Sequence, residues 1–289
     1  MRFCLCQYHI SRVVLVGLFA LLLSACALSP KKAESRIASD DLLAQQFEIV
    51  DKNLAQTPRG ERVVLYVGSA QHSQSLVFQR DVLLVQKRLL AVNPRVQSII
   101  LSNELQTSKL LYPFATLHTL KQTFDRIAIW SKRYALTLVV LISTHGNVDI
   151  LSSNVANEYY TPIQSKHLQP WLDELGDTPT TVILSACYSG SFLPKLASAK
   201  RIVLTAAAAD RNSFGCSYHT ANTYFIGELF GSSFNPAKTW QQNFDVARQG
   251  IEQREKAMQA AAPSNPQSSI PNSWADETVV DLLMPRQAR

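Results

Sequence analysis

Five short apolar runs, rich in Val, Ile and Leu and without polar alternation, most limit the folds open to this chain. Strands that are buried on both faces show this pattern. Stretches with apolar residues at helical spacing separate the runs. The alternation predicts an α/β fold with a mostly parallel central sheet and helices on both faces. The five runs are Arg62–Val67, Val96–Leu101, Leu136–Ile142, Thr181–Leu184 and Arg201–Leu204.

Helices are expected before, between and after these runs, and Leu136–Ile142, the most hydrophobic run, is expected at the centre of the sheet. In Ser75–Leu90 the helical pattern is that of Leu76, Leu83, Leu84, Lys87 and Leu90. The expected helices are Asp41–Gln56, Ser75–Leu90, Thr116–Tyr134, Ser165–Leu175, Ser191–Ala199, Thr220–Phe230 and Ala237–Met258.

The C-terminal part contains a Pro- and Ser-rich segment, Ala262–Ser273, which is expected to be a loop. The following Glu277–Leu283 is either a late strand or a loose tail. Neither an internal repeat nor a second-domain boundary is apparent, so residues 61–289 are predicted to form one domain.

The N-terminus has the features of an export signal. Met1–Arg12 carries two arginines and no acid, and Val13–Leu23 is an 11-residue apolar run. A basic segment, a short apolar core and small residues at the end are typical of a cleaved signal peptide. The alternative is an uncleaved membrane anchor, although the run is shorter than the roughly 20 residues that span a bilayer.

The residues that end this segment, Leu23-Ser24-Ala25-Cys26, resemble the lipobox of bacterial lipoproteins at all four positions. The resemblance implies cleavage after residue 25 and attachment of acyl chains to Cys26, which would tether the protein to a membrane. Ala27, where retention signals have Asp, implies sorting to the outer membrane, and we expect the protein to face the periplasm. Residues 26–60 would then be a lipidated N-terminus, a polar tether (Ser29–Asp41) and the leading helix.

Charge gives little support for nucleic acid as a partner. The net charge is +6, and the charged residues are scattered without a basic stripe or interleaved aromatics. Histidines and cysteines lack metal-ligand spacing, and no organic cofactor is implied. We therefore expect neither a metal nor a cofactor, and the oligomeric state is left open.

A histidine and a cysteine follow two of the predicted strands. His145 lies three residues after Leu136–Ile142, and Cys187 lies three residues after Thr181–Leu184. Ligands of open parallel sheets bind beyond the carboxyl ends of the strands. An imidazole near a cysteine favours the thiolate, which is the nucleophilic form. The pair therefore predicts nucleophilic catalysis by Cys187 with His145, with a hairpin and a crossover helix between them.

Glycines follow both residues and permit tight turns. The backbone N–H groups of Gly146 and Cys187 are predicted to stabilise an oxyanion, and a helix starting after Gly190 would favour the thiolate through its dipole. Simpler readings stay open: His145 as a structural histidine, and Cys187 as a small buried residue. After export, Cys187 and Cys216 are the two cysteines left, and in an oxidising compartment they are also candidates for one disulfide.

The motifs Ser143–Gly146, "STHG", and Ser185–Ser191, "SACYSGS", resemble those of the C13 cysteine peptidases, the legumain family of the caspase-like clan. Thr205–Cys216 and Thr223–Phe225 resemble the segments that follow them in the family. The resemblance covers about residues 62–231. It implies a caspase-like three-layer sandwich and an endopeptidase or transpeptidase in which Cys187 forms a thioester and His145 protonates the leaving amine. It also implies that Cys216 is structural.

Departures from the family pattern affect the substrate pocket. Thr144 and Ser185 stand where legumains have acidic residues. The Arg and Asp of the legumain pocket correspond to about Val77 and His219, with Arg80 close by. The asparagine that orients the legumain histidine has no clear match near Ser73–Ser75. Cleavage after asparagine is therefore not implied, and the preferred residue stays open.

Other side chains are candidates for the substrate pocket by their place near the predicted strand ends or in the family segments. They are His72, Ser185, Asp210, Ser213 and His219. Two other function classes remain. One is a lipoprotein that keeps the fold but only binds peptides or envelope partners, and the other is a serine hydrolase, for which a G-x-S-x-G motif is missing.

Overall fold

The computed structural model describes residues 30–105, 110–156, 158–217 and 219–284, with side chains from residue 35 onward. Contacts group the chain into residues 1–37 and 38–289, and the second unit holds the sheet and the candidate site. The signal segment and the lipobox Leu23–Cys26 lie outside the described residues. Within the described residues, every helix is too short or too polar to cross a membrane.

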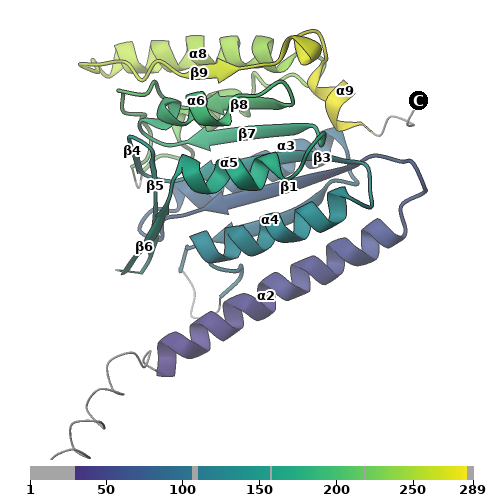
Figure 1. Ribbon diagram of the computed structural model, residues 1–289. Coiled ribbons are helices and arrows are strands. Elements are labelled where there is room, and N and C mark those ends of the chain that lie inside the picture. Colours follow the sequence, from purple (N-terminus) through teal and green to yellow (C-terminus); the bar gives the residue numbers. More distant parts are fainter. Residues whose placement is uncertain (1–29, 106–109, 157, 218, 285–289) are drawn as a thin grey trace, which may run out of the picture. The chain divides into compact units, whose positions relative to one another are not determined.

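A six-stranded sheet with the order β2-β1-β3-β7-β8-β9 forms the centre of the second unit (Figure 1). The first five of these strands pair in parallel, which confirms the predicted parallel sheet, and β3 lies in its interior as expected. The last strand, β9, pairs with β8 in the antiparallel direction at the edge. The strands are β1 (Val63–Ala70), β2 (Gln97–Ser102), β3 (Leu136–Ser143), β7 (Thr180–Ser185), β8 (Arg201–Thr205) and β9 (Gln267–Ser269).

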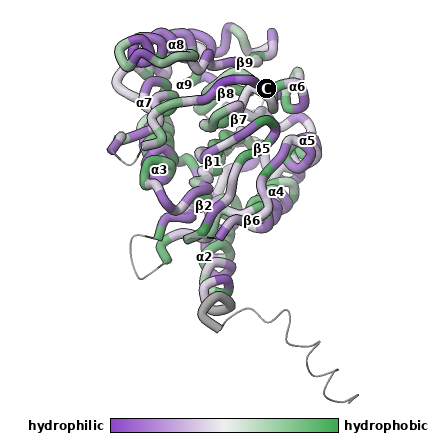
Figure 2. The backbone as a smooth tube through the Cα atoms, turned by 90° about the vertical axis from the view of Figure 1, so that its left-hand side faces the viewer, coloured by the Kyte–Doolittle hydropathy of each residue, from purple (hydrophilic) through white to green (hydrophobic). Residues whose placement is uncertain are grey.

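Helices cover both faces of this sheet and complete a three-layer α/β sandwich. Figure 2 shows α3, α7 and α8 on one side of the strands and α4, α5 and α6 on the other. The helices are α2 (Pro30–Ala55), α3 (Val77–Val92), α4 (Leu117–Ser131), α5 (Ser165–Asp173), α6 (Leu193–Leu196), α7 (Tyr224–Leu229), α8 (Trp240–Ala257) and α9 (Val279–Leu283), with short 3-10 turns at Ser189–Phe192 and Asn272–Trp274.

The alternation of side chains along the strands decides which face each residue meets. In β3, Leu138, Val140 and Ile142 enter the core beneath α4 and α5. Val139 and Leu141 enter the opposite core, which α3, α7 and α8 cover. Both sets are almost fully buried, which explains why the strand reads as a continuous apolar run.

The chain forms a second, three-stranded antiparallel sheet after β3 and before α5. It consists of β4 (Gly146–Asn147), β5 (Ile150–Val155) and β6 (Glu158–Ile163) in that order. With α5 it provides the hairpin and crossover helix expected between His145 and Cys187. It also brings Asn154 alongside His72 in an isolated bridge.

Three local expectations were wrong or incomplete. The Pro-rich segment expected to be a loop contributes β9, because its edge position requires only three residues of pairing with β8. The segment expected as a late strand or tail is the short helix α9, which Thr278 caps by accepting from the N–H of Asp281. The polar stretch expected as a tether is helical from Pro30 onward.

The buried face of α3 does not follow from the spacing of its leucines. The helix is apolar on more than one side, and Leu83, Leu84 and Leu90 are only partly buried. The face that meets the sheet instead contains an acidic residue, Asp81, among apolar neighbours. The fully covered side chains are Val77, Phe78, Asp81, Val82, Val85 and Leu89.

Candidate active site

The strand register brings His145 and Cys187 to neighbouring positions. The last paired residues of β3 and β7 are Ser143 and Ser185, and each candidate lies two residues further along its chain. The N–H of Thr144 donates to the carbonyl of Ser185 at 3.1 Å, so the chains remain side by side past the last rung. Neighbouring strands are about 4.8 Å apart. Because side chains alternate, both residues also fall on the sheet face that α3 covers.

Gly146, the residue after His145, lies directly against the cysteine. A Cβ at position 146 would be 2.5 Å from the carbonyl oxygen of Cys187 and 3.0 Å from Cβ of Ala186. Gly146 pairs with Leu151, and the N–H of Ser152 donates to the carbonyl of His145 at 2.9 Å. In this antiparallel pattern the N–H of Gly146 points away from β5 and takes no part in the ladder.

The cysteine sits at the start of a tight turn. Tyr188 has φ 57°, in the left-handed region, and its N–H donates to the carbonyl of Arg211 at 2.7 Å. Within the described part of the chain, no backbone hydrogen bond uses the N–H of Cys187. The Sγ of Cys187 accepts from the N–H of Ser213 at 3.3 Å and lies 3.6 Å from that residue's Oγ. Ser213, a candidate for the substrate pocket, therefore contacts the sulfur.

The helix expected at Ser191–Ala199 is different in the structure. A 3-10 turn begins at Ser189, and α6 that follows has only four residues, with Pro194 in its first turn. Gly190 is packed so tightly that an added Cβ would be 2.8 Å from the carbonyl oxygen of Ala207. A single turn has a small dipole, so support for the thiolate from this helix is weaker than expected.

His145 is enclosed by two aromatic rings. Its ring centroid is 4.7 Å from that of His72, at an interplanar angle of 89°, and 5.0 Å from that of Phe78. Burial lowers the pKa of His145, and burial together with the neighbouring His145 lowers the pKa of His72 to about 4. His72 is therefore neutral at physiological pH, and its Nδ1 lies 3.4 Å from the N–H of Gln74.

Cys216 belongs to the same region but is not bonded to Cys187. Both cysteines are free thiols in the structure, and both are partly buried. Burial and the nearby Cys187 raise the pKa of Cys216, which makes its thiolate scarce at neutral pH. The carbonyl of Cys216 accepts from the hydroxyl of Ser75 at 3.4 Å, which ties this loop to the start of α3.

The remaining pocket candidates are not equally close. Ser185 is buried, and its hydroxyl shares a 3.0 Å hydrogen bond with that of Thr223, so it lies beneath the site. Asp210 is exposed and lies 3.5 Å from the guanidinium of Arg211. His219 is exposed in the loop before α7. Of the candidates, His72 contacts His145, and Ser213 contacts Cys187.

Three residues near the site were not identified as site candidates by sequence analysis. They are Phe78, Asp81 and Thr223. Phe78 packs on His145, and the carboxylate of Asp81 accepts from the hydroxyls of Ser143 and Thr223, both at 2.8 Å. An acid on the apolar face of a helix is the signal that marks Asp81. The sequence does not single it out, because α3 is apolar on more than one side and the buried face cannot be told from the spacing.

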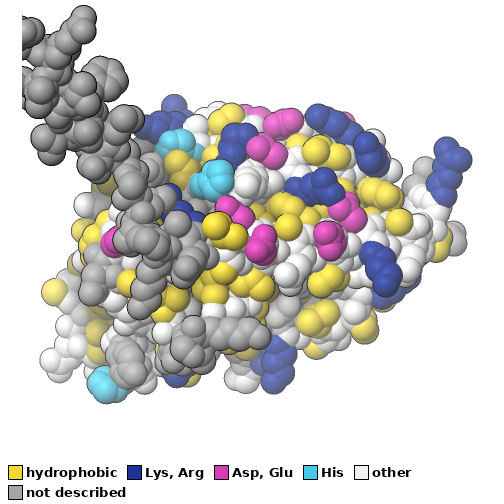
Figure 3. All heavy atoms as spheres, turned by 90° about the horizontal axis from the view of Figure 1, so that it is seen from below, with side chains coloured by type: hydrophobic (Ala, Val, Ile, Leu, Met, Phe, Trp, Pro, Cys, Tyr) yellow, Lys and Arg dark blue, Asp and Glu magenta, His cyan; other side chains and the backbone are white. Residues whose placement is uncertain are grey.

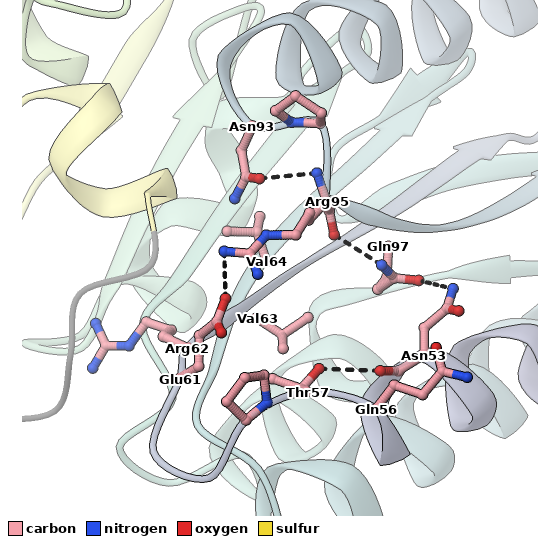
Figure 4. A pocket seen from close by; sticks show the side chains of 12 residues that line it. Asn53, Gln56, Thr57, Glu61, Arg62, Val63, Val64, Asn93, Arg95 and Gln97 are labelled. Atoms are coloured by element: carbon pink, nitrogen blue, oxygen red, sulfur yellow. Dashed lines mark hydrogen bonds and ion pairs between the residues drawn. The ribbon is translucent and has the colours of Figure 1, made fainter.

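The opposite end of the sheet has a hollow of about 370 Å³ at the amino ends of β1 and β2 (Figure 4). Its lining includes Val63, the ion pair between Arg95 and Glu61, and a hydrogen bond from Asn53 to Gln97. None of its twelve lining residues is a Cys, His, Ser or Lys. This hollow is separate from the carboxyl ends of β3 and β7.

The last two features of the molecule are the distribution of charge on its surface and the grouping of side chains that could bind a metal ion. On the face drawn in Figure 3, basic and acidic side chains are interspersed among polar and apolar ones. Among the described residues, no three His, Cys, Asp or Glu side chains are grouped so as to hold a metal ion. The expectations of no nucleic acid partner and no metal remain predictions.

The fold and the paired strand ends define a caspase-like α/β protein. Caspase-1 from Spodoptera frugiperda has a similar structure, with a TM-score of 0.51 and 13% sequence identity over 73% of this chain and 87% of that chain. At this identity the similarity establishes the fold alone. None of the curated proteins matches this chain.

The sequence itself gives the family. The model of the Peptidase C13 family matches residues 131–276, which is half of the chain and includes both His145 and Cys187. The chain belongs to the Peptidase C13 family, as the motifs predicted. Family and fold together support a function of the cysteine-peptidase type.

Proposed function

We propose that the protein is a cysteine peptidase that cleaves or transfers peptide bonds with Cys187 as nucleophile and His145 as its partner. The observation that carries the proposal is the register of β3 and β7, which ends at Ser143 and Ser185 and puts both residues two positions further on the same face. The family supports the same pair, because its model covers both.

The first half of the reaction forms a thioester. His145 takes the proton of the Cys187 thiol, the resulting thiolate attacks the carbonyl carbon of the peptide bond, and the carbonyl oxygen becomes an oxyanion. The N–H groups of Gly146 and Cys187 donate to this oxyanion, because neither is used by a neighbouring strand. The C–N bond then breaks, and the departing amine takes a proton from His145.

The second half regenerates the enzyme. Water attacks the thioester while His145 accepts one of its protons, and the carboxylic acid leaves. His145 then returns that proton to the sulfur and restores the thiol of Cys187. If an amine attacks instead of water, a new peptide bond forms. The contacts of Cys187 favour neither acceptor, so hydrolysis and transpeptidation are both included in the proposal.

The test is covalent labelling of the purified residue 38–289 unit and of the full chain with an acyloxymethyl-ketone peptide probe. Wild-type protein should gain one label at Cys187, and Cys187→Ala should gain none. His145→Ala should lose most labelling. Cys216→Ala is the matched control, because it removes the other thiol of the region and should be labelled like wild type. Full labelling of His145→Ala, or of Cys187→Ala, would exclude the dyad.

A second candidate is a protein that retains the fold and binds peptides without cleaving them. The observation in its favour is that Thr144 and Ser185 are buried and hydrogen-bonded to the protein itself, at positions where legumains have acids. A peptide library incubated with wild type and Cys187→Ala under reducing conditions distinguishes the two. Turnover that depends on Cys187 excludes the binding function.

The N-terminal segment supports a further part of the proposal, that the protein is an outer-membrane lipoprotein facing the periplasm. Its basis is the lipobox Leu23–Cys26 followed by Ala27. Cells grown with a labelled fatty acid should incorporate it into wild type, and Cys26→Ala should remain unlabelled and be released from the membrane fraction. Fatty-acid labelling of Cys26→Ala would contradict lipidation at this residue.

A further inference from the structure

A buried carboxylate lies beneath the two strand ends that carry His145 and Cys187. Asp81, on α3, has no exposed surface. A buried carboxylate is costly unless donors satisfy its oxygens. Asp81 has four such donors. They are the hydroxyl of Ser143 at 2.8 Å, the hydroxyl of Thr223 at 2.8 Å, the N–H of Thr223 at 3.0 Å and the side-chain amide of Asn222 at 3.0 Å.

These contacts link both halves of the candidate dyad. Ser143 is the last residue of β3 and precedes His145 by two positions. The hydroxyl of Thr223, which donates to Asp81, also lies 3.0 Å from that of Ser185, the residue two before Cys187. One carboxylate therefore touches the histidine strand directly and the cysteine strand through a single hydroxyl.

The same face of α3 also touches the histidine ring. Phe78 precedes Asp81 by three residues, so the two side chains lie one above the other on the helix. The Phe78 ring is 5.0 Å from that of His145, and both helix residues are fully buried. A shift of α3 would therefore move the ring packing and the Ser143 contact together.

We propose that Asp81 is a positioning residue for the dyad, holding the ends of β3 and β7 so that His145 and Cys187 stay in reacting geometry. The inference rests on the proposed function, because it assigns a role in that reaction. Asp81 does not touch substrate. It acts through Ser143 on one side and through Thr223 and Ser185 on the other.

The charge state of Asp81 supports this role. Burial raises its pKa to about 6, while its hydrogen bonds from Ser143, Thr223 and Asn222 oppose the rise. The groups that donate to it, from Ser143 on β3 and from Asn222 and Thr223 at the start of α7, are neutral. Tyr66 on β1 is the titratable group that it affects, since burial and then the carboxylate raise the pKa of that phenol.

The first variant is Asp81→Asn, which keeps the shape but replaces one acceptor oxygen by a donor. The hydroxyls of Ser143 and Thr223 donate to one oxygen of Asp81, and the N–H groups of Thr223 and Asn222 donate to the other. The new side-chain NH₂ must therefore disrupt one of these two pairs of contacts, whichever way the amide is turned. Small misplacements of reacting groups cost up to about 100-fold in rate. We expect at least about a tenfold lower rate of Cys187 alkylation by iodoacetamide at neutral pH, and a similar fall in kcat with KM little changed.

The matched control is Glu255→Gln, the same chemical change at another buried carboxylate. Glu255 is on α8 and accepts from the N–H and hydroxyl of Ser264. Any loss of stability from replacing a buried carboxyl group by an amide should appear in both variants, whereas slow alkylation should appear only in Asp81→Asn. The component of the alkylation pH profile near pH 6 should also vanish only in Asp81→Asn.

A second variant keeps the proposal testable if Asp81→Asn does not fold. Ser143→Ala removes one donor and leaves Asp81 with three. Alkylation should slow by a few-fold, with an unfolding midpoint near that of wild type. If both single variants fold, their double mutant should be slowed by less than the product of the two separate effects, because Asp81 and Ser143 are partners in one contact.

The outcomes are decisive in either direction. If Asp81→Asn folds and is alkylated at the wild-type rate, the inference is overturned. If Asp81→Asn does not fold, a wild-type alkylation rate in Ser143→Ala overturns it. Alkylation needs no peptide substrate, so it separates the two proposals. If wild type turns over no peptide but Asp81→Asn is still alkylated slowly, the peptidase proposal fails and the positioning role stands.

Discussion

The carbonyl oxygen of Cys187 occupies the space that a side chain on Gly146 would need, 2.5 Å from where its Cβ would be. Real Cβ atoms do not approach a backbone oxygen this closely. The two strand ends that carry the candidate dyad are therefore in contact through their backbones, and the separation of His145 from Cys187 depends on a glycine.

Gly146→Ala should push the strand ends apart. The obstacle is backbone rather than a flexible side chain, so the turn after His145 or the turn after Cys187 must move. Overpacking of this kind typically costs about 1–3 kcal/mol of stability. We expect a loss of Cys187 labelling of about tenfold or more, because displaced groups react slowly. Labelling rates and urea unfolding of the purified variant are the measurements.

Gly227→Ala is the control for this substitution. Gly227 lies in α7, and an added Cβ would meet only ordinary contacts, with Cβ of Asn222 at 3.6 Å. Alanine inside a helix is favoured over glycine by roughly 0.5–1 kcal/mol. The variant should be as stable as wild type or more so, and fully labelled. Equal labelling of Gly146→Ala and Gly227→Ala would show that the close approach at Gly146 is unimportant.

Cys216→Ala should leave the reaction intact. Its thiol is partly buried and its pKa is raised, so it is protonated at neutral pH and a poor nucleophile. We expect one equivalent of iodoacetamide per residue 38–289 unit, which contains only Cys187 and Cys216, in wild type and in Cys216→Ala under short exposure, identified by peptide mapping. The variant should also resist inactivation by mild oxidants that join two thiols. Loss of activity in Cys216→Ala under reducing conditions would assign this thiol a role in the reaction.

His72 and Asp81 should make opposite contributions to the pH dependence of stability. The pKa of His72 falls from 6.5 to about 4 on folding, so the stability it contributes is present above 6.5 and lost as pH falls toward 4. The pKa of Asp81 rises from 3.8 to about 6, so its contribution is present below 3.8 and lost as pH rises through 6. Between about pH 4 and 6 the two slopes oppose each other.

Replacing one of the two side chains should leave the pH dependence of stability that the other one causes. Against wild type, His72→Phe should lose stability more steeply as pH rises between about 4 and 6, and Asp81→Asn should gain it. Each slope should change by at most about 1.4 kcal/mol per pH unit, the value for one proton. Urea unfolding at several pH values measures both, and subtracting the wild-type curve removes the other carboxylates. Slopes that change in the same direction would contradict the assignment.

Much of the fold could be predicted because buried strands have a recognisable apolar pattern in the sequence. The runs at Leu136–Ile142 and Thr181–Leu184 are apolar throughout, since both strand faces are covered, and that property also predicts a parallel sheet. The same alternation extends past the strand ends. It places His145 on the face of Val139 and Leu141, a consequence that the apolar pattern already contains.

The parts that could not be predicted depend on contacts between distant segments. α3 is apolar on several sides, and only packing against β3 and α7 determines that Phe78 and Asp81 face inward. The hydrogen bond between Ser185 and Thr223 joins residues 38 positions apart. β9 has a polar sequence, Gln267–Ser269, and is a strand only because the edge of β8 is available to it.

The turn after the nucleophile offers a last test through the backbone of Tyr188. Its φ of 57° is in the left-handed region, which a β-branched side chain adopts only with strain and glycine adopts freely. Its carbonyl also accepts from the N–H of Ser191 at 3.0 Å and from the Ser191 hydroxyl at 2.6 Å, so the conformation is held from the following turn. The left-handed backbone conformation of Tyr188 therefore helps to set the position of Cys187.

Substitutions at Tyr188 should be ranked by backbone preference. Tyr188→Gly relieves the strain but frees the unfolded chain, so its stability should stay within about 1 kcal/mol of wild type. Tyr188→Val should be less stable than Tyr188→Gly by about 1–2 kcal/mol, because branching at Cβ crowds the left-handed conformation. Urea unfolding gives the ranking, and Cys187 labelling should follow it. Equal stability of the glycine and valine variants would mean that the turn rearranges without cost.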